Sequence, residues 1–287
     1  EDGGAEVLSP MARAEQLCQD ILEEVRDIKF PTDDISKSLT DEEKGPYQFV
    51  FLQECDYMNG LVGEMVRSLS ELQLGFKGEL TMSEQMERLI DALYLERIPD
   101  MWMKLGFPTT RQLSSWLVNL KERCDQLGDW TNDPISIPKV TDVSRLFNPQ
   151  SFLTAIKQVT CQVQQLELNK LQVVTEITKR DVKQIETLAR DGAYVCGLYL
   201  EGARWDMASN SLEDSKPKEM FCKMPVVQCR AGMVSDKEDK NIYQCPTYCT
   251  PTRRPYYVFP AQLRTKYPPA KWVLAGVALI LDIGYTL

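Results

Sequence analysis

Four cysteines in the last quarter of the chain are the residues best suited by type to bind a metal ion: Cys222, Cys229, Cys245 and Cys249. Zinc ribbons and fingers use cysteines in closely spaced pairs. Here six, fifteen and three residues lie between successive cysteines, which is not that pattern. The whole sequence holds nine cysteines, an odd number, and the others are scattered. We therefore predict no metal site, and we interpret the cysteines as reduced thiols of a cytosolic type of compartment.

Histidine is absent from the sequence. This excludes Ser-His-Asp and Cys-His catalysis, HExxH metalloprotease chemistry and every histidine general base. Carboxylate and lysine mechanisms remain open. Adjacent carboxylates that occur at predicted helix starts or in loops are usually solvated caps. Such pairs are Asp33-Asp34, Glu42-Glu43 and Glu213-Asp214. We predict no catalytic residue in this chain, and hence no enzyme.

No segment of the sequence has the pattern of a nucleotide-binding loop. The segment Gly75-Phe76-Lys77-Gly78 lacks both the glycine spacing of a phosphate loop and the Ser or Thr that follows its lysine. A Rossmann G-x-G-x-x-G is also absent. We therefore expect no cofactor site.

Basic and aromatic residues alternate near the C-terminus, as they do on proteins that bind single-stranded nucleic acid. The basic members are Arg253, Arg254, Arg264, Lys266 and Lys271, and the aromatic ones are Tyr256, Tyr257, Phe259 and Tyr267. The alternative is a solvated basic face whose aromatic rings turn into the core. The net charge of −9 and the absence of a recognised RNA motif favour this alternative. A freestanding nucleic-acid-binding barrel is kept as the competing function.

Charge divides the sequence into two regions, because residues 1–146 carry a net charge of −13 and residues 147–287 a net charge of +4. The segment 131–138 holds two prolines and has no helical period, so it reads as a connection. We predict a helical region over 1–140 and an α+β region over 141–287. The longest apolar run, 272–281, is half the length of a membrane-spanning helix of about twenty residues, so we expect no membrane span.

Capping residues and apolar spacing predict five helices. The first starts at Ser9-Pro10 and ends before Pro31, and the second follows the Thr40/Glu43 signal, starts at Gly45-Pro46 and ends at Phe76. The third starts at a Thr81/Glu84 capping box and ends before Pro99, and the fourth follows Thr109-Thr110. The fifth starts at Asn148-Pro149, and its residues Phe152, Ile156, Val159 and Val163 lie together.

The second helix carries an apolar seam with heptad spacing, which has two interpretations. Its members step by 4, 3, 4, 3, 4, 3, 4 residues: Phe51, Cys55, Met58, Val62, Met65, Leu69, Leu72 and Phe76. The seam is either a dimerising coiled coil or a face that packs on helices of the same chain, and its short length favours the second. Gly60 and Gly63 weaken this helix, so we expect a neighbouring element to pack closely on them.

After Leu171 the apolar period changes from helical spacing to two, which indicates strands. We predict strands over 173–177, 194–200, 224–230, 242–248, 256–263 and 272–283. Pro246 and Pro260 should lie at sheet edges or bulges, because proline cannot donate to a ladder. Trp205-Asp206 reads as a turn closed by an aromatic plug and an Asx bond. The predicted fold class is α+β: an N-terminal helical array, then helices and a small antiparallel open β-barrel.

Five segments resemble, in order, the carboxy-terminal end of axonemal dynein heavy chains. They are Gly45 to Tyr47, Leu74 to Met82, Phe147 to Ile156, Gly197 to Asp206 and Lys271 to Leu279. The sequences of residues 77–82 and 146–156 are most similar to the β-type outer-arm subfamily, and the resemblance spans about residues 45–283. Three positions differ from the family pattern: Asp142 and Arg145 stand where an aromatic residue and a glycine are expected, and Cys196 stands where histidine or tyrosine is common.

The resemblance implies a fragment of a much larger polypeptide. It implies helices that close the sixth AAA+ module and a C-terminal domain of helices and a small barrel, lying on one face of a motor ring. It also implies that the parent heavy chain hydrolyses ATP with Mg, steps along microtubules in cilia and flagella, and binds dynein intermediate and light chains. The fragment is then expected to pack on other AAA+ modules of its own heavy chain in a structural and regulatory role, with no nucleic-acid or membrane partner.

Overall fold

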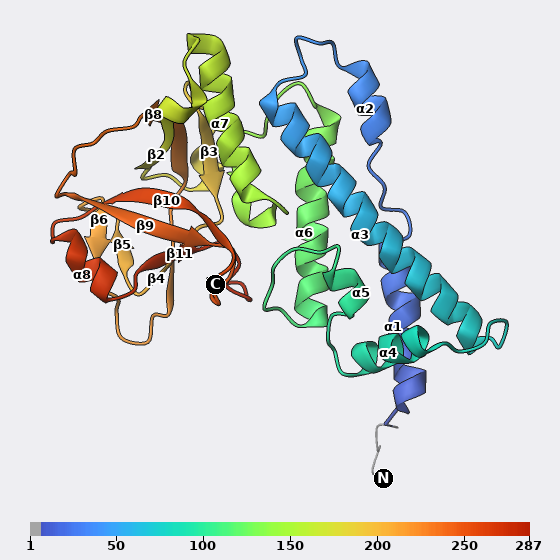
Figure 1. The fold of residues 1–287 in the computed structure, drawn as a ribbon. Coiled ribbons are helices and arrows are strands. Elements are labelled where there is room, and N and C mark those ends of the chain that lie inside the picture. Colours follow the sequence, from blue (N-terminus) through green and yellow to red (C-terminus); the bar gives the residue numbers. More distant parts are fainter. Residues whose placement is uncertain (1–6) are drawn as a thin grey trace.

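A computed structural model describes residues 7–287 and divides them into a helical part and a β-rich part (Figure 1). The helices that precede residue 133 lie on one side and the sheets on the other, while helix α7 (Pro149–Gln164) lies between them (Figure 1). One buried apolar cluster runs through both parts, from Ala14 in the first helix to Leu281 near the end. Helices and sheets therefore share a core. No helix of the described residues is long and apolar enough to cross a bilayer.

The helical part packs around one long helix, α3. The helices are α1 (Pro10–Val25), α2 (Thr32–Ser38), α3 (Pro46–Phe76), α4 (Glu84–Tyr94), α5 (Asp100–Met103) and α6 (Leu113–Asn132). Helices α1, α2, α4, α5 and α6 all contact α3, and so does α7. The sequence did not predict the short helices α2 and α5. It also placed the start of α6 too early, because Gln112 rather than Thr109 or Thr110 precedes the helix.

The heptad seam of α3 packs within the chain, which confirms the second interpretation. Its residues from Phe51 to Leu72 are at most 2% exposed, and their neighbours come from the surrounding helices. The expectation for Gly60 and Gly63 is wrong, since a Cβ at either position would meet no atom within 4 Å. Both glycines lie away from any close neighbour, so the packing on α3 does not depend on them.

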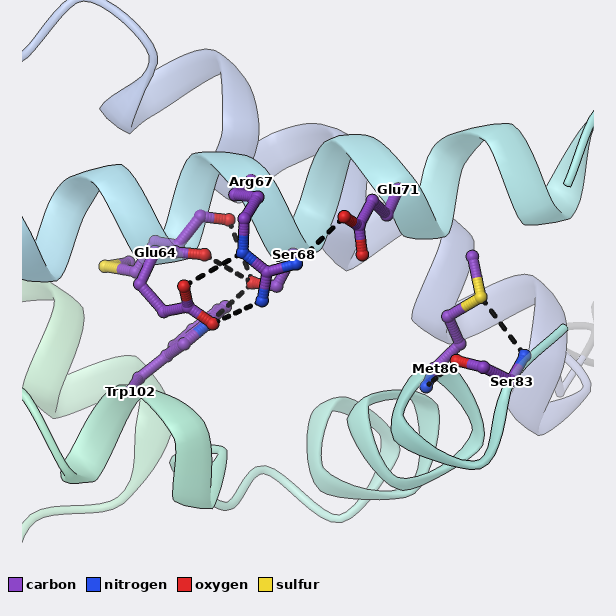
Figure 2. A network of polar contacts seen from close by, with 8 residues as sticks. Glu64, Arg67, Ser68, Glu71, Ser83, Met86 and Trp102 are labelled. Atoms are coloured by element: carbon purple, nitrogen blue, oxygen red, sulfur yellow. Dashed lines mark hydrogen bonds and ion pairs between the residues drawn. The ribbon is translucent and has the colours of Figure 1, made fainter.

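The predicted starts of α1, α3 and α7 are confirmed in place, and the capping residue predicted for α4 is wrong. The Ser9 hydroxyl accepts a hydrogen bond from the Ala12 amide, and the Asn148 side chain accepts one from the Ser151 amide. Helix α4, however, starts from Ser83 and not from Thr81. The Ser83 hydroxyl accepts a hydrogen bond of 3.2 Å from the Met86 amide, while the Ser83 amide lies 3.3 Å from the Met86 sulfur (Figure 2).

We expect Ser83→Ala to lower the free energy of unfolding by about 1 kcal/mol, because the Met86 amide loses its capping acceptor. Thr81→Ala is the matched control and should change it by less than about 0.5 kcal/mol. Urea denaturation of the three proteins measures both values. If Thr81→Ala lowers the free energy of unfolding as much as Ser83→Ala does, or if it alone lowers it, Ser83 is not the capping residue.

A buried side-chain hydrogen bond ties α5 to α3 beside an exposed ion cluster. The Trp102 indole N–H donates to the Ser68 hydroxyl at 2.9 Å, and both residues are buried. On the outer face, Arg67 bridges Glu64 and Glu71 (Figure 2). The Arg67 pairs lie within α3 and, being exposed, contribute little, whereas the Trp102 bond joins α5 to α3.

The β-rich part contains helix α7 (Pro149–Gln164), helix α8 (Pro269–Leu274) and eleven short strands among the described residues. A four-stranded sheet has the order β1-β3-β8-β2, a five-stranded sheet the order β10-β9-β11-β4-β7, and β5 pairs with β6. The strands are β1 (Thr141–Asp142), β2 (Leu171–Ile177), β3 (Ala193–Cys196), β4 (Tyr199–Glu201), β5 (Arg204–Asp206), β6 (Ser211–Glu213), β7 (Phe221–Lys223), β8 (Val227–Met233), β9 (Ile242–Tyr248), β10 (Tyr257–Arg264) and β11 (Ala278–Ile280).

The α+β class is confirmed, but a closed barrel is not found among the described residues and the sheets are not purely antiparallel. β1 pairs with β3 and β11 pairs with β9 in parallel.

The two larger sheets meet where β2 passes β10. There the Thr175 amide donates to the Gln262 side-chain oxygen, the Gln262 amide donates to the Thr175 hydroxyl, and the Gln262 side-chain amide donates to the Val173 carbonyl. We call these contacts the side-chain seam.

Two predicted strands are wrong. The run 194–200 is broken at Gly197, whose φ of +86° turns the backbone out of β3 and into β4 of the other sheet. The run 272–283 begins in helix α8 and only its middle is the short strand β11. The predicted inward face of α7 also ends early, because Val163 is 78% exposed.

The two strand prolines lie opposite each other. Pro260 is in β10, an edge strand, as predicted; Pro246 is in β9, an interior strand of the sheet, which the prediction did not expect. The ladder tolerates Pro246 because the paired residues of β11 face Thr247 and Tyr248 and not the proline. The turn predicted at Trp205-Asp206 is displaced, because both residues lie in β5 and the turn follows at 207–210. The buried Trp205 ring and the bond from the Ser209 amide to the Asp206 carboxylate are as predicted.

Candidate functional site

The residues singled out from the sequence do not come together in one place. The four C-terminal cysteines lie on β7, β8, β9 and the loop after β9. Among residues 7–287, no three Cys, Asp or Glu side chains form a group that could hold a metal ion. Burial raises the pKa of the Cys229 thiol to about 12. Cys196 lies at the end of β3, where burial likewise raises the pKa of its thiol.

The basic residues near the C-terminus largely pair with carboxylates of the same chain. Lys271 lies 3.0 Å from Asp214, and Lys266 lies 3.5 Å from Glu213. Arg253 donates to the Gly276 carbonyl at 2.7 Å. Phe259 turns into the core, while Tyr256, Tyr257 and Tyr267 are each 40–47% exposed. This arrangement gives no support to nucleic-acid binding.

The strongest concentration of buried charge lies where the helices meet the sheets, and we call it the joint. It consists of Glu54, Arg111, Arg123, Asp282 and the link 146–148, which leads into α7. Glu54 is 1% exposed and Arg123 2% exposed, and the Asp282 residue is 5% exposed. Fully buried charges are rare in proteins unless other groups satisfy them, so the partners of each residue matter.

Glu54 holds the amide side of the link. It projects from α3, and its two carboxylate oxygens accept hydrogen bonds from the Phe147 amide at 2.6 Å and the Asn148 amide at 2.8 Å. These amides directly precede α7, where Asn148 is the N-cap. Burial raises the pKa of Glu54 to about 7, although both amides and the nearby Arg123 act in the opposite direction.

Arg123 holds the carbonyl side of the same link. It projects from α6 and donates to the Leu146 carbonyl at 3.2 Å and to the Asn119 side-chain oxygen at 2.8 Å. Its guanidinium carbon lies 3.4 Å from the centre of the Phe107 ring, a cation–π contact. Burial lowers the pKa of Arg123 to about 10, so the guanidinium stays protonated at neutral pH. Glu54 and Arg123, which carry opposite charges, thus bind adjacent backbone groups of one link.

Asp282 connects the segment that follows β11 to the loop before α6. The Arg111 guanidinium lies 3.0 Å from its carboxylate, and the Thr109 hydroxyl donates to it at 3.3 Å. Its own amide donates to the Cys249 carbonyl, and its carboxylate also accepts the Gly284 amide. Thr109, predicted to start a helix, instead belongs to this cluster.

A further pair of bonds connects α6 to β1. The Gln126 side chain donates to the Asp142 carbonyl at 3.1 Å and accepts the Asp142 amide at 2.8 Å. Asp142 also pairs with Arg145 at 3.2 Å. A cleft of about 440 Å³ opens beside these bonds, lined in part by Arg111, Asp142, Arg145 and Asp282.

The joint can hold two parts of the chain together. Its charges face backbone groups and each other, and they come from α3, α6 and the C-terminal segment, which lie far apart in sequence. None of these charged residues was predicted from the sequence. A signal was present, since Arg123 occupies the apolar face of α6 between Leu120 and Leu127, where an arginine needs a buried partner.

The comparisons with known proteins agree with the resemblance. A family model for the C-terminal domain of dynein heavy chains matches residues 2–281. A dynein beta chain of the flagellar outer arm from Chlamydomonas reinhardtii is 47% identical over 284 residues, which is 99% of this chain and 6% of that relative. A ciliary dynein beta chain from Heliocidaris crassispina is 43% identical over 84% of this chain, and the human dynein axonemal heavy chain 9 is 40% identical over 94%.

The chain spans only 5–6% of the length of these relatives. The dynein alpha chain of the Chlamydomonas reinhardtii outer arm is 39% identical, below the beta chain of the same organism, which agrees with the β-type wording of 77–82. The family match covers nearly every residue. The protein therefore belongs to the dynein heavy chain family and represents its C-terminal domain.

Proposed function

We propose that the chain is the C-terminal part of an axonemal dynein heavy chain of the outer-arm β type, in the cytoskeleton of a cilium or flagellum. The support is its 47% identity to a beta chain of the flagellar outer arm and its 43% identity to a ciliary beta chain. Its parent heavy chain is an ATP-driven motor that binds ATP and Mg in other modules. That motor moves along microtubules with intermediate and light chains.

Within that motor the fragment has a structural and regulatory role and no catalysis of its own. It packs on AAA+ modules of the same heavy chain and limits how they move during the ATP cycle. Such a brace acts by contacting one nucleotide state of the ring better than another. It needs no cofactor, nucleic acid or membrane.

The joint is the observation that carries this proposal. A brace transmits load only if its parts move together, and Glu54 and Arg123 fix the link between the helices and the sheets from both sides. We place the boundary between the two regions near residue 140, and we treat the sheets joined by the side-chain seam as one open, barrel-like unit.

Removing residues 147–287 from a full-length heavy chain tests the proposal. We expect a changed ATPase rate, microtubule-gliding velocity or stall force. Arg111→Ala, which breaks the pair with Asp282, should change the same quantities in the same direction by less. Lys266→Ala, at an exposed pair outside the joint, is the control and should match the wild type. If the truncated motor matches the intact one in all three quantities, the regulatory role is refuted.

A further inference from the structure

The carboxylate of Glu54 is buried without an ion pair. Among residues 7–287 no lysine or arginine forms a salt bridge with it, and its polar contacts are the Phe147 and Asn148 amides. An ionised carboxylate offers about four acceptor sites, so two amides leave it half satisfied. Burying a charge in this condition is costly, and a buried acid lowers the cost by binding a proton.

The charged groups around Glu54 do not remove this cost. From α6, the Arg123 guanidinium is the nearest cation, but it is committed to Leu146, Asn119 and the Phe107 ring and is shared with Asp282 and Asp142. On α3 itself the neighbours are the Cys55 thiol and the exposed Asp56, and Cys124 of α6 lies beside Cys55. The link 146–148 contributes the Phe147 and Asn148 amides, which carry no charge.

Opening the link would change the state of Glu54. When 146–148 leaves α3 and α6, the carboxylate reaches water and becomes an ordinary exposed acid. The closed and open joint therefore differ in their affinity for a proton, and this difference links the position of the joint to pH.

We propose that the joint is proton-linked: Glu54 takes up a proton when the link 146–148 closes on α3 and releases it when the link opens. Acidification then tightens the contact between the helices and the sheets, and alkalinisation loosens it. This regulation rests on the proposed role of the joint as a mechanical link, but the proton exchange itself is a property of this chain alone.

The direction follows from the sign of the linkage. Burial raises the pKa of Glu54 to about 7 in the closed joint, above the ordinary value of 4.5. Closing therefore binds protons between these two values, and the open fraction rises as the pH rises through this window. Outside this window the equilibrium no longer responds to Glu54.

Hydrogen exchange at the Phe147 and Asn148 amides tests the proposal, because these are the groups that bond to Glu54. We expect their protection factors, corrected for the intrinsic pH dependence of exchange, to rise about tenfold from about pH 8 to about pH 6. Glu54→Gln, which keeps the shape and cannot titrate, should abolish the rise. Glu64→Gln, on the exposed face of the same helix, should keep it.

Protection that stays constant or falls on acidification across this range in the wild-type chain overturns the proposal, whether or not Glu54→Gln folds. The measurement uses the 287-residue chain and no motor assay. A truncated motor that behaves normally would refute the bracing role and leave this result untouched, while a flat exchange profile would refute the proton linkage and leave the bracing role standing.

Discussion

Replacing Arg123 with methionine is expected to lower the free energy of unfolding by about 3–5 kcal/mol, because two buried acceptors, the Leu146 carbonyl and the Asn119 side-chain oxygen, lose their charged donor. Methionine keeps most of the apolar stem but removes the hydrogen bonds to Leu146 and Asn119 and the contact with Phe107. It also leaves Glu54 without its nearest cation. Urea denaturation at about pH 8, where Glu54 is ionised, measures the loss.

Lys121→Met is the matched control for Arg123→Met, because Lys121 lies on the same helix with 56% of its side chain exposed. Its expected effect is within about 0.5 kcal/mol. Combining Arg123→Met with Glu54→Gln should cost less than the two single changes added together, since the second change removes the negative charge that Arg123 stabilises at a distance. Strict additivity would mean that the two residues do not act as one joint.

Gly192→Ala is expected to destabilise the protein by about 3 kcal/mol or more through backbone overlap and left-handed strain together. Gly192 precedes β3 with a φ of +68°, and a Cβ there would lie 1.9 Å from the Cys229 carbonyl oxygen of β8. The neighbour is main chain, so it cannot turn aside. β3 would have to leave β8, and with it the first sheet.

The thermal unfolding midpoint compares Gly192→Ala with Gly63→Ala, which adds the same methyl group to α3 where no atom lies within 4 Å. Gly63→Ala should instead stabilise the protein by about 0.5–1 kcal/mol, because alanine loses less entropy than glycine in a helix. A small effect of Gly192→Ala would show that β3 does not need its close approach to β8.

The long elements could be predicted because their signals are local and repeated. The seam of α3 runs through a helix of 31 residues with unbroken spacing, and strand β9 was predicted with its observed limits, Ile242–Tyr248. The error at 272–283 arose because an apolar run reads as a buried strand. Pro269 in the first turn and Gly276, with its φ of +67° just after the helix, were the local marks of α8.

The joint could not be predicted in the same way. Glu54 and Arg123 are separated by 68 intervening residues, and their common target, the link 146–148, is ordinary in sequence. What brings them together is the packing of α3 and α7 against each other and of α6 on α3, which no local pattern encodes. The informative mark was a charge on an apolar helix face, at position 54 as well as at 123.

The side-chain seam has a consequence for how the sheets can separate. β2 and β10 are joined by the amide and hydroxyl of Thr175, which bond to the side chain and the main-chain amide of Gln262. The main-chain ladder of β2 runs to β8, and that of β10 runs to β9. Substitutions at Thr175 and Gln262 could therefore weaken or strengthen the contact between the two sheets without breaking the main-chain hydrogen bonds of either strand. Closely related motors could differ in stiffness at this line while keeping the same fold.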